Sequence, residues 1–166
     1  MRSAVPEDLP QLKAMYKEIV RQMQRDGLSV WDEVYPCEFL GEDIAQGRLY
    51  VLTRQKEIAA AFALCSGCEG ARHVQWQEPQ APACYIDRLG VNPAVQRQGA
   101  GSEALQQAAA LAGAQGAAYL RLFVVEGNGP ARRLYEKNGF RQAGGFYDER
   151  IDEDLVLREF GLEKKI

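Results

Sequence analysis

A glycine-rich turn is the part of this sequence whose residue types best suit the binding of a ligand. It runs from Gln96 to Ser102, follows an expected strand and opens an alanine-rich helix. Gly99 and Gly101 remove side chains that would keep a ligand away from the backbone. The first amides of a helix lack an intrahelical partner and carry the positive end of the helix dipole. The turn therefore predicts an anion site, typically for phosphate, although glycines there could also serve only a tight turn.

The elements that must position this turn are predicted from hydrophobic periodicity and turn residues. An amphipathic helix is expected from Pro6 to Arg25 and a shorter one from Glu38 to Gln46. Residues 66 to 80 have no clear period and are expected to form a long loop that borders a site. The remaining expected elements are the strands Leu49 to Thr53, Ile58 to Cys65 and Cys84 to Val91, the helix Gln98 to Gly113, the strand Tyr119 to Val125, the helix Pro130 to Asn138, and the strands Phe140 to Tyr147 and Asp152 to Phe160. This order predicts an α/β protein with a mixed sheet.

The composition limits the classes of function. A chain of 166 residues with 46% hydrophobic content suits a single domain over residues 1–166. The 20 basic and 23 acidic residues give a net charge of −3, too weak a field to attract nucleic acid or an anionic membrane. We expect neither partner, and with no apolar signal core or membrane span we expect a cytoplasmic protein.

Metal and hydrolase sites have little support in the sequence. The four cysteines are Cys37, Cys65, Cys68 and Cys84, and only the middle two have a ligand-like C-x-x-C spacing. The single histidine, His73, lies in the expected long loop, which disfavours a Ser-His-Asp or Cys-His site. We expect reduced thiols and no metal.

A second block follows the glycine-rich turn. It contains Asn128, Ala131, Tyr135, Gly139 and Phe140 in the pattern Asn-x-x-Ala-x-x-x-Tyr-x-x-x-Gly-Phe. With the first block, Leu89 to Ser102, it resembles the two signature blocks of the GCN5-related N-acetyltransferase (GNAT) superfamily, and the chain looks like an uncharacterised bacterial member. The resemblance implies the GNAT acyl-CoA N-acyltransferase fold, of α/β (α+β) class. That fold has a mixed, mostly antiparallel sheet with splayed central parallel strands, flanked by about four helices.

The resemblance also implies acetyl-CoA as the acyl donor, with no metal. Its pyrophosphate would lie on the amides of the turn, and its pantetheine arm would pair with the edge of the splayed strand, where Gly90 permits close approach. This sequence has Arg97 where the family often has glycine and Ala100 where it often has a larger aliphatic residue. Asn128 would bind the arm, or else cap the following helix. The implied donor-binding residues are Leu89, Gly90, Val91, Gln96, Arg97, Gln98, Gly99, Ala100, Gly101, Ser102, Asn128 and Ala131.

Two residues are predicted to carry the chemistry. The family places Tyr135 beside the sulfur of the donor, where a phenol with an ordinary pKa near ~10 can protonate the leaving thiolate. Asp87 is the nearest carboxylate upstream, and strand alternation would put it on one face with Leu89 and Val91, as a base for the attacking amine. The alternatives are that Tyr135 packs in the core and that Asp87 pairs with an arginine, such as Arg48 or Arg88 of a neighbouring molecule.

The acceptor is predicted from segments that vary within the family. Acidic residues there would attract a cationic amine to an aromatic-walled site, although solvated carboxylates and core tryptophans are the alternative. The candidate acceptor residues are Trp31, Glu33, Tyr35, Trp76 and Tyr147. We expect acetyl transfer to a primary amine of a small molecule or peptide, by direct attack in a ternary complex. A non-catalytic acyl-CoA sensor of the same fold is the alternative, and a homodimer is allowed for.

Overall fold

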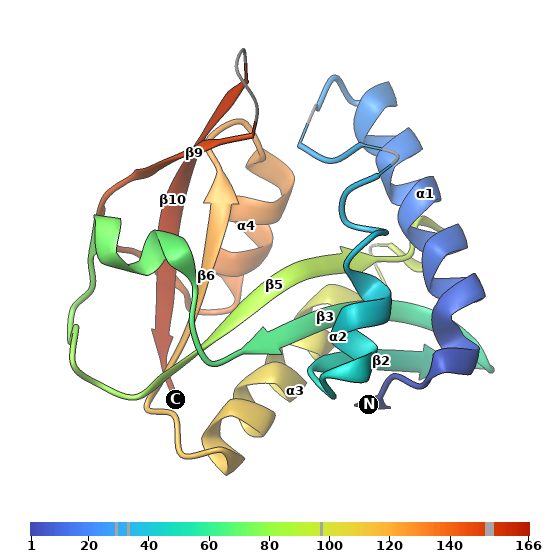
Figure 1. The fold of residues 1–166 in the computed structure, drawn as a ribbon, viewed down its shortest axis with the longest axis horizontal. Coiled ribbons are helices and arrows are strands. Elements are labelled where there is room, and N and C mark those ends of the chain that lie inside the picture. The colour runs from blue at the N-terminus through green and yellow to red at the C-terminus, as the bar shows by residue number, and fades with distance from the viewer. Residues whose placement is uncertain (29, 33, 97, 152–154) are drawn as a thin grey trace. The chain divides into compact units, whose positions relative to one another are not determined.

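The structure is a computed structural model that describes residues 1–28, 30–32, 34–96, 98–151 and 155–166 (Figure 1). It has the predicted mixed α/β architecture, with a mostly antiparallel sheet. The chain divides into two compact units, which are described separately. The first unit comprises Met1–Leu64 and Arg88–Gln107, and the second comprises Cys65–Asp87 and Ala108–Ile166.

The first unit contains an antiparallel set of strands. β1 (Arg2–Ser3), β2 (Leu49–Arg54) and β3 (Glu57–Cys65) follow one another in the sheet, and β5 (Ala83–Val91) comes next to β3. β5 runs through both units, because its residues from Arg88 onward belong to the first and the earlier ones to the second. The strand β3 is buried from Ile58 to Leu64, which matches its unbroken run of small and apolar side chains.

Two helices of the first unit pack against each other. α1 (Leu9–Arg25) follows a short 3₁₀ turn and buries Leu12, Met15, Tyr16, Ile19 and Val20, the helical spacing on which it was predicted. α2 (Leu40–Ala45) is shorter than the predicted segment and contacts both α1 and β2 (Figure 1). α3 (Ala100–Ala114) begins in this unit, directly after the glycine-rich turn.

The second unit is organised around β6 (Tyr119–Val125), whose bounds are those predicted. The first part of β5 pairs with β6 in parallel, from Ala83 opposite Tyr119 to Ile86 opposite Leu122. β10 (Val156–Lys165) runs antiparallel along β6 and also pairs with β7 (Arg141–Gln142) and β9 (Tyr147–Arg150) (Figure 1). α4 (Gly129–Lys137) follows β6, and β4 (Val74–Gln75) pairs with β8 (Gly144–Gly145).

The predicted strand from Phe140 to Tyr147 was wrong as a continuous element. The chain there forms β7, β8 and the first residue of β9, because the backbone N–H of Ala143 donates to Gly161 (2.9 Å) and Gly145 is left-handed (φ +79°). The long loop predicted over 66–80 also contains a 3₁₀ helix, Glu69–His73, and β4. Of the predicted strand from Asp152 to Phe160, residues 152–154 lie outside the described residues.

β10 extends beyond its predicted end, to Lys165. Its last part, residues 161–165, was not predicted as a strand. In the structure Leu162 and Glu163 are buried, at 1% and 6% exposure. None of the helices in the described part of the chain has the length and hydrophobicity that a membrane span requires.

Candidate active site

The glycine-rich turn forms the start of α3, as predicted. Gly99 is left-handed (φ +82°), a conformation that favours glycine, and α3 begins at the next residue, Ala100, which is 1% exposed. The backbone N–H of Glu103 donates to the carbonyl of Gly99 (3.0 Å), so the first helical turn is regular. The amides before Glu103 are those that a helix leaves for an external acceptor. Arg97 lies outside the described residues.

Two residues that sequence reasoning missed hold this turn. The Asn92 side chain accepts from the amide of Ala94 (3.0 Å) and donates to the carbonyl of Ile58 on β3 (2.9 Å). Arg54, at the end of β2, donates to the carbonyl of Gln98 (3.1 Å) and forms an ion pair with Glu103 (2.6 Å). Asn followed by proline is a local signal that would have pointed to Asn92. Arg54 offered none, because its partners lie far along the chain.

The strand β5 departs from regular geometry at Arg88. This residue has a φ of +53°, so side-chain alternation does not continue through it. The prediction that Asp87, Leu89 and Val91 share one face assumed a regular strand, and the strand is not regular at Arg88. The recorded pairing of β5 with β6 also ends at Ile86, just before this irregularity.

Gly90 is required by packing against α1. A Cβ at this position would lie 2.7 Å from Cε1 of Tyr16 and 2.9 Å from Cδ1 of Ile19, both too close for real atoms. Sequence reasoning assigned this glycine to the approach of a ligand and did not foresee the helix. Packing against α1 is therefore enough to explain why residue 90 has no side chain, and a ligand on Leu89 to Val91 is not needed to explain it.

The start of α4 is capped by Asn128. Its side-chain oxygen accepts a hydrogen bond from the backbone N–H of Ala131 (3.2 Å), which is the capping geometry considered as an alternative. The Ala131 N–H is thus already engaged. The side-chain amide of Asn128 keeps its N–H₂ group as a donor.

Tyr135 lies on α4 and is 8% exposed, with its ring 6.0 Å from that of Phe140. Burial raises the pKa of its hydroxyl above the ordinary value, and the nearby charge of Asp87 raises it further. The phenol therefore stays protonated at neutral pH. The ring is packed in the core, which is the placement considered as the alternative.

Three carboxylates lie near one another in the second unit: Asp87, Glu149 and Glu159. Burial raises the pKa of Glu159 to about 8, and the charges of Glu149 and Asp87 contribute. The pKa of Glu149 is raised by burial and then by Asp87. In the β9–β10 ladder Glu159 is opposite Tyr147, so Tyr147, Glu149 and Glu159 share a face of this hairpin. Sequence reasoning missed Glu159.

Glutamine in place of Glu159 should change the pH dependence of stability. A carboxyl with a raised pKa stabilises the fold below its unfolded pKa and loses that contribution as pH rises through the folded value. For Glu159 this window runs from 4.5 to about 8. As the pH increases through this window, wild type should lose stability that the Glu159→Gln variant keeps. The difference in free energy of unfolding, variant minus wild type, should therefore increase by at most about 1.4 kcal/mol per pH unit. Urea denaturation at several pH values measures this, and parallel curves would contradict the burial of the carboxyl.

The predicted acceptor residues are placed in different units. In the first, Trp31 packs on Tyr16 (ring centroids 5.7 Å apart) and on Tyr35 (6.3 Å), and both Trp31 and Tyr35 are half-buried. In the second, Tyr147 is half-buried and stacks on His73 (5.0 Å). Glu33 lies outside the described residues. Among the other acidic residues, Asp32 accepts from two backbone amides of its own turn and Asp148 pairs with Arg158.

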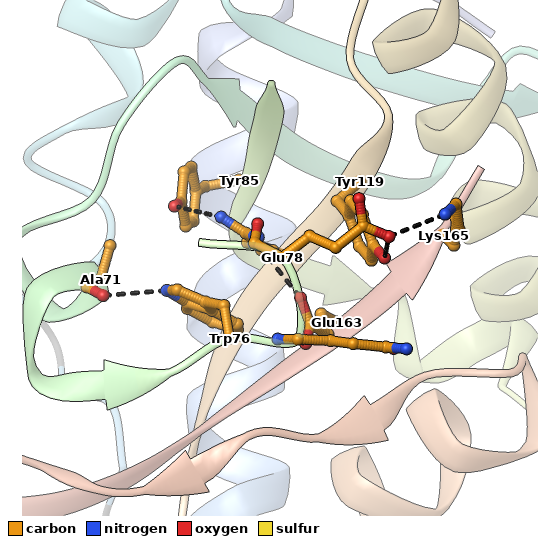
Figure 2. A network of polar contacts seen from close by, with 9 residues as sticks. Ala71, Trp76, Glu78, Tyr85, Tyr119, Glu163 and Lys165 are labelled. Carbon is orange, nitrogen blue, oxygen red and sulfur yellow. Dashed lines mark hydrogen bonds and ion pairs between the residues drawn. The ribbon is translucent and has the colours of Figure 1, made fainter. Parts of the chain in front are cut away.

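Trp76 is in the core of the second unit, at 7% exposure, and its indole N–H donates to the carbonyl of Ala71 (2.9 Å). Figure 2 shows it within a polar network that includes Glu78, Tyr119 and Glu163. This is the core placement that was considered as an alternative. The network is organised by Arg121, whose guanidinium carbon lies 4.6 Å from the centre of the Trp76 ring.

Asp43 binds the two arginines that were named as alternative partners of Asp87, and the pairing of Asp87 with a neighbouring molecule stays a prediction. Arg48 and Arg88 both form ion pairs with Asp43, at 2.6 and 2.9 Å. Within the described ranges, no three histidine, cysteine or acidic side chains gather closely enough to hold a metal ion.

Comparison with known proteins identifies the family. Residues 12–140 match the acetyltransferase (GNAT) family. No curated protein matches the sequence. A GNAT-family acetyltransferase from Streptococcus agalactiae has a similar structure, with a TM-score of 0.78 and 17% identity over 99% of this chain and 94% of that chain. A GNAT-family acetyltransferase from Listeria monocytogenes has a TM-score of 0.73 and 16% identity, over 99% of this chain and 93% of that chain.

A third similar structure is the ribosomal-protein-S18-alanine N-acetyltransferase from Escherichia coli. Its TM-score is 0.66 at 23% identity, over 99% of this chain and 91% of that chain. At such identities the solved structures show a shared fold and no more. The family match itself covers most of the chain and contains both signature blocks. The protein therefore belongs to the GNAT acetyltransferase family.

Proposed function

We propose that this protein is an acetyl-CoA-dependent N-acetyltransferase that acts on a primary amine of a small molecule or peptide. The observation that carries the proposal is Tyr135, a buried phenol at the family's motif position and within the field of Asp87. An acyl-CoA sensor would need the phosphate turn but not a protonated hydroxyl at that position. A cytoplasmic location and a single domain over residues 1–166 remain predictions from the sequence.

The donor fits the glycine-rich turn. Gly99, Ala100 and Gly101 place backbone amides at the start of α3, and the left-handed Gly99 lets the chain turn without a side chain in the way. The amides of Gln96 and Gln98 already donate to the carbonyls of Pro93 and Val95. We propose that the amides of Gly99, Ala100 and Gly101 bind the pyrophosphate and that the backbone of Leu89 to Val91 binds the pantetheine arm. The donor supplies an activated acetyl group as a thioester. The N–H₂ group of Asn128 is proposed as a further donor to the arm, because its oxygen already caps α4.

Tyr135 is proposed as the general acid. When the amine attacks the thioester carbonyl, the departing sulfur gains negative charge, and a neutral phenol can give it a proton. Because its pKa is raised, the hydroxyl is fully protonated over the physiological range. The same burial excludes water, which would otherwise compete for the thioester.

Asp87 is proposed as the group that removes the proton from the attacking amine, directly or through water. Its charge influences both Tyr135 and Glu159, which indicates that acid and base lie in one electrostatic environment. Glu159, with a pKa of about 8, already carries its proton at neutral pH, so Asp87 is the proposed acceptor of the proton. The half-buried carboxylates favour a cationic acceptor. Tyr147, which shares a face with Glu149 and Glu159, is proposed to contact it. Trp31 and Tyr35 remain predictions from the sequence, and Trp76 is buried and is left out.

Replacing Asp87 with asparagine should lower kcat/KM roughly tenfold or more, and most strongly at acidic pH. At alkaline pH the amine is already neutral and needs the base less. The pH profile of kcat/KM with a saturating donor measures the effect. A small loss that does not vary with pH would instead favour a structural role for Asp87.

The function itself is tested with a panel of primary amines and short peptides, in which release of free CoA from acetyl-CoA is followed by thiol detection. Turnover that depends on the amine supports the proposal. Binding of acetyl-CoA without release of CoA on any amine would favour the sensor alternative. Activity on neutral or anionic acceptors alone would contradict the proposed preference for cationic amines.

A further inference from the structure

Residues from two helices of the first unit, α1 and α2, bind Arg88, the irregular residue of β5. Arg88 is left-handed, a conformation that costs free energy for a residue with a side chain. Its carbonyl oxygen accepts a hydrogen bond from the hydroxyl of Tyr16 on α1 (2.6 Å). The ring of the same tyrosine leaves no room for a side chain at Gly90. The backbone on both sides of Leu89 is therefore fixed from the α1 side.

The side chain of Arg88 is fixed by Asp43 on α2. Asp43 is fully buried, and its two oxygens accept hydrogen bonds from Nε (2.9 Å) and Nη2 (3.0 Å) of Arg88, a bidentate arrangement. The Arg88 side chain is only 7% exposed, and its guanidinium carbon lies 5.3 Å from the ring centre of Phe39. Arg48 donates a third hydrogen bond to the same carboxylate (2.6 Å). Without Asp43, the buried charge of Arg88 would lose its bidentate partner.

We propose that Asp43 is a positioning residue for acetyl transfer, because its ion pair with Arg88 maintains the left-handed residue that sets the direction of the following backbone. The inference rests on the proposed function, in which the backbone of Leu89 to Val91 binds the donor arm. The torsion angles of Arg88 set the orientation of the peptide groups after it. A return of Arg88 to ordinary strand geometry would turn those groups away, and displacement by about 1 Å can cost a reaction roughly a hundredfold in rate.

The first test is Asp43→Asn, which keeps the size of the side chain but removes the charge and one acceptor. We expect kcat/KM for acetyl-CoA to fall at least roughly tenfold, with the KM for the amine unchanged. Hydrogen exchange of the β5 amides should accelerate. Where this variant does not fold, Arg88→Lys gives the same comparison, because lysine keeps the charge but cannot form the bidentate pair.

The decisive variant is Asp43→Asn combined with Arg88→Gly. Glycine adopts the left-handed conformation without the side-chain cost, and it also removes the buried charge. The double variant should therefore recover most of the lost kcat/KM and most of the exchange protection. A role of Asp43 in stability alone would not give this recovery of kinetic constants. A double variant no better than Asp43→Asn would overturn the inference.

Asp8→Asn is the matched control. Asp8 is 9% exposed, belongs to the same unit and pairs bidentately with Arg2 (2.6 and 2.7 Å). It also accepts a hydrogen bond from the backbone N–H of Val5 (2.9 Å), which is not part of β5. Its replacement should lower the melting temperature and leave the kinetic constants unchanged. Wild-type kcat/KM in Asp43→Asn, below its melting temperature, would overturn the inference.

Failure of the proposed function can be distinguished experimentally from failure of the proposed role of Asp43. A wild-type protein that binds acetyl-CoA but acetylates no amine overturns that function. The calorimetric affinity of each variant for CoA then takes the place of kcat/KM: the same loss in Asp43→Asn and recovery in the double variant support the role of Asp43, and equal affinities overturn it.

Discussion

Phenylalanine in place of Tyr135 should lower kcat for acetyl transfer by roughly a hundredfold or more, because the change removes the proposed proton donor to the leaving thiolate. The ring is kept, and so is its packing against Phe140. The KM for acetyl-CoA should change little, since the hydroxyl acts on charge that develops only in the transition state. Steady-state kinetics with the best amine of the panel measure both constants.

The pH profile adds a second readout for Tyr135. Since burial and Asp87 raise the pKa of this hydroxyl, wild-type kcat should show no alkaline decline from this group until above the ordinary pKa of tyrosine, near ~10. Tyr119→Phe is the matched control: Tyr119 is also buried and donates to Glu78 (2.7 Å), but lies in the structural network. Full kcat in Tyr135→Phe over the whole pH range would remove the assignment.

The fold was predictable where local pattern decides the structure. β6 is a run of apolar residues bounded by turn signals, and α1 shows one apolar face with helical spacing. β10 was predicted to end at Phe160 but extends to Lys165. Glu163 is buried because it meets Arg121, 42 positions away, and no local window contains both partners. The break at Ala143 likewise depends on its bond to Gly161 of another strand.

The same limit applies to the candidate site. The turn at Gly99 and the cap at Asn128 are local, and the sequence indicated both. The environment of Asp87 is not local, because Glu149 and Glu159 come from a distant hairpin. The irregular geometry at Arg88 depends on Tyr16 and Asp43, 72 and 45 positions away. Candidate ligand-binding residues can thus be recognised from sequence motifs. The residues that shift their pKa values or fix their geometry are found only in the folded structure.

Methionine in place of Arg121 should lower the free energy of unfolding by about 3–5 kcal/mol, the cost of leaving a buried partner charge uncompensated. The Arg121 side chain is 2% exposed and bonds to Glu163 (3.3 Å) and to the carbonyl of Glu78 (2.8 Å). The variant leaves the Glu163 carboxylate with the backbone amide of Gln77 (2.6 Å) in a buried site. Trp76 also loses its cation–π contact. Urea denaturation at neutral pH measures the loss.

Two further variants separate the loss of a partner from the loss of a large side chain. Arg158→Met removes an ion pair with Asp148 at a site where the side chains are 44% and 40% exposed, so it should destabilise the protein far less than Arg121→Met does. Arg121→Met with Glu163→Gln removes both charges and should recover much of the stability, because no buried carboxylate is then left without its cation. If Arg121→Met is as mild as Arg158→Met, the second unit does not depend on this ion pair. If the double variant is no more stable than Arg121→Met, the cost lies in the packing of the arginine between Trp76 and Tyr119 and not in its charge.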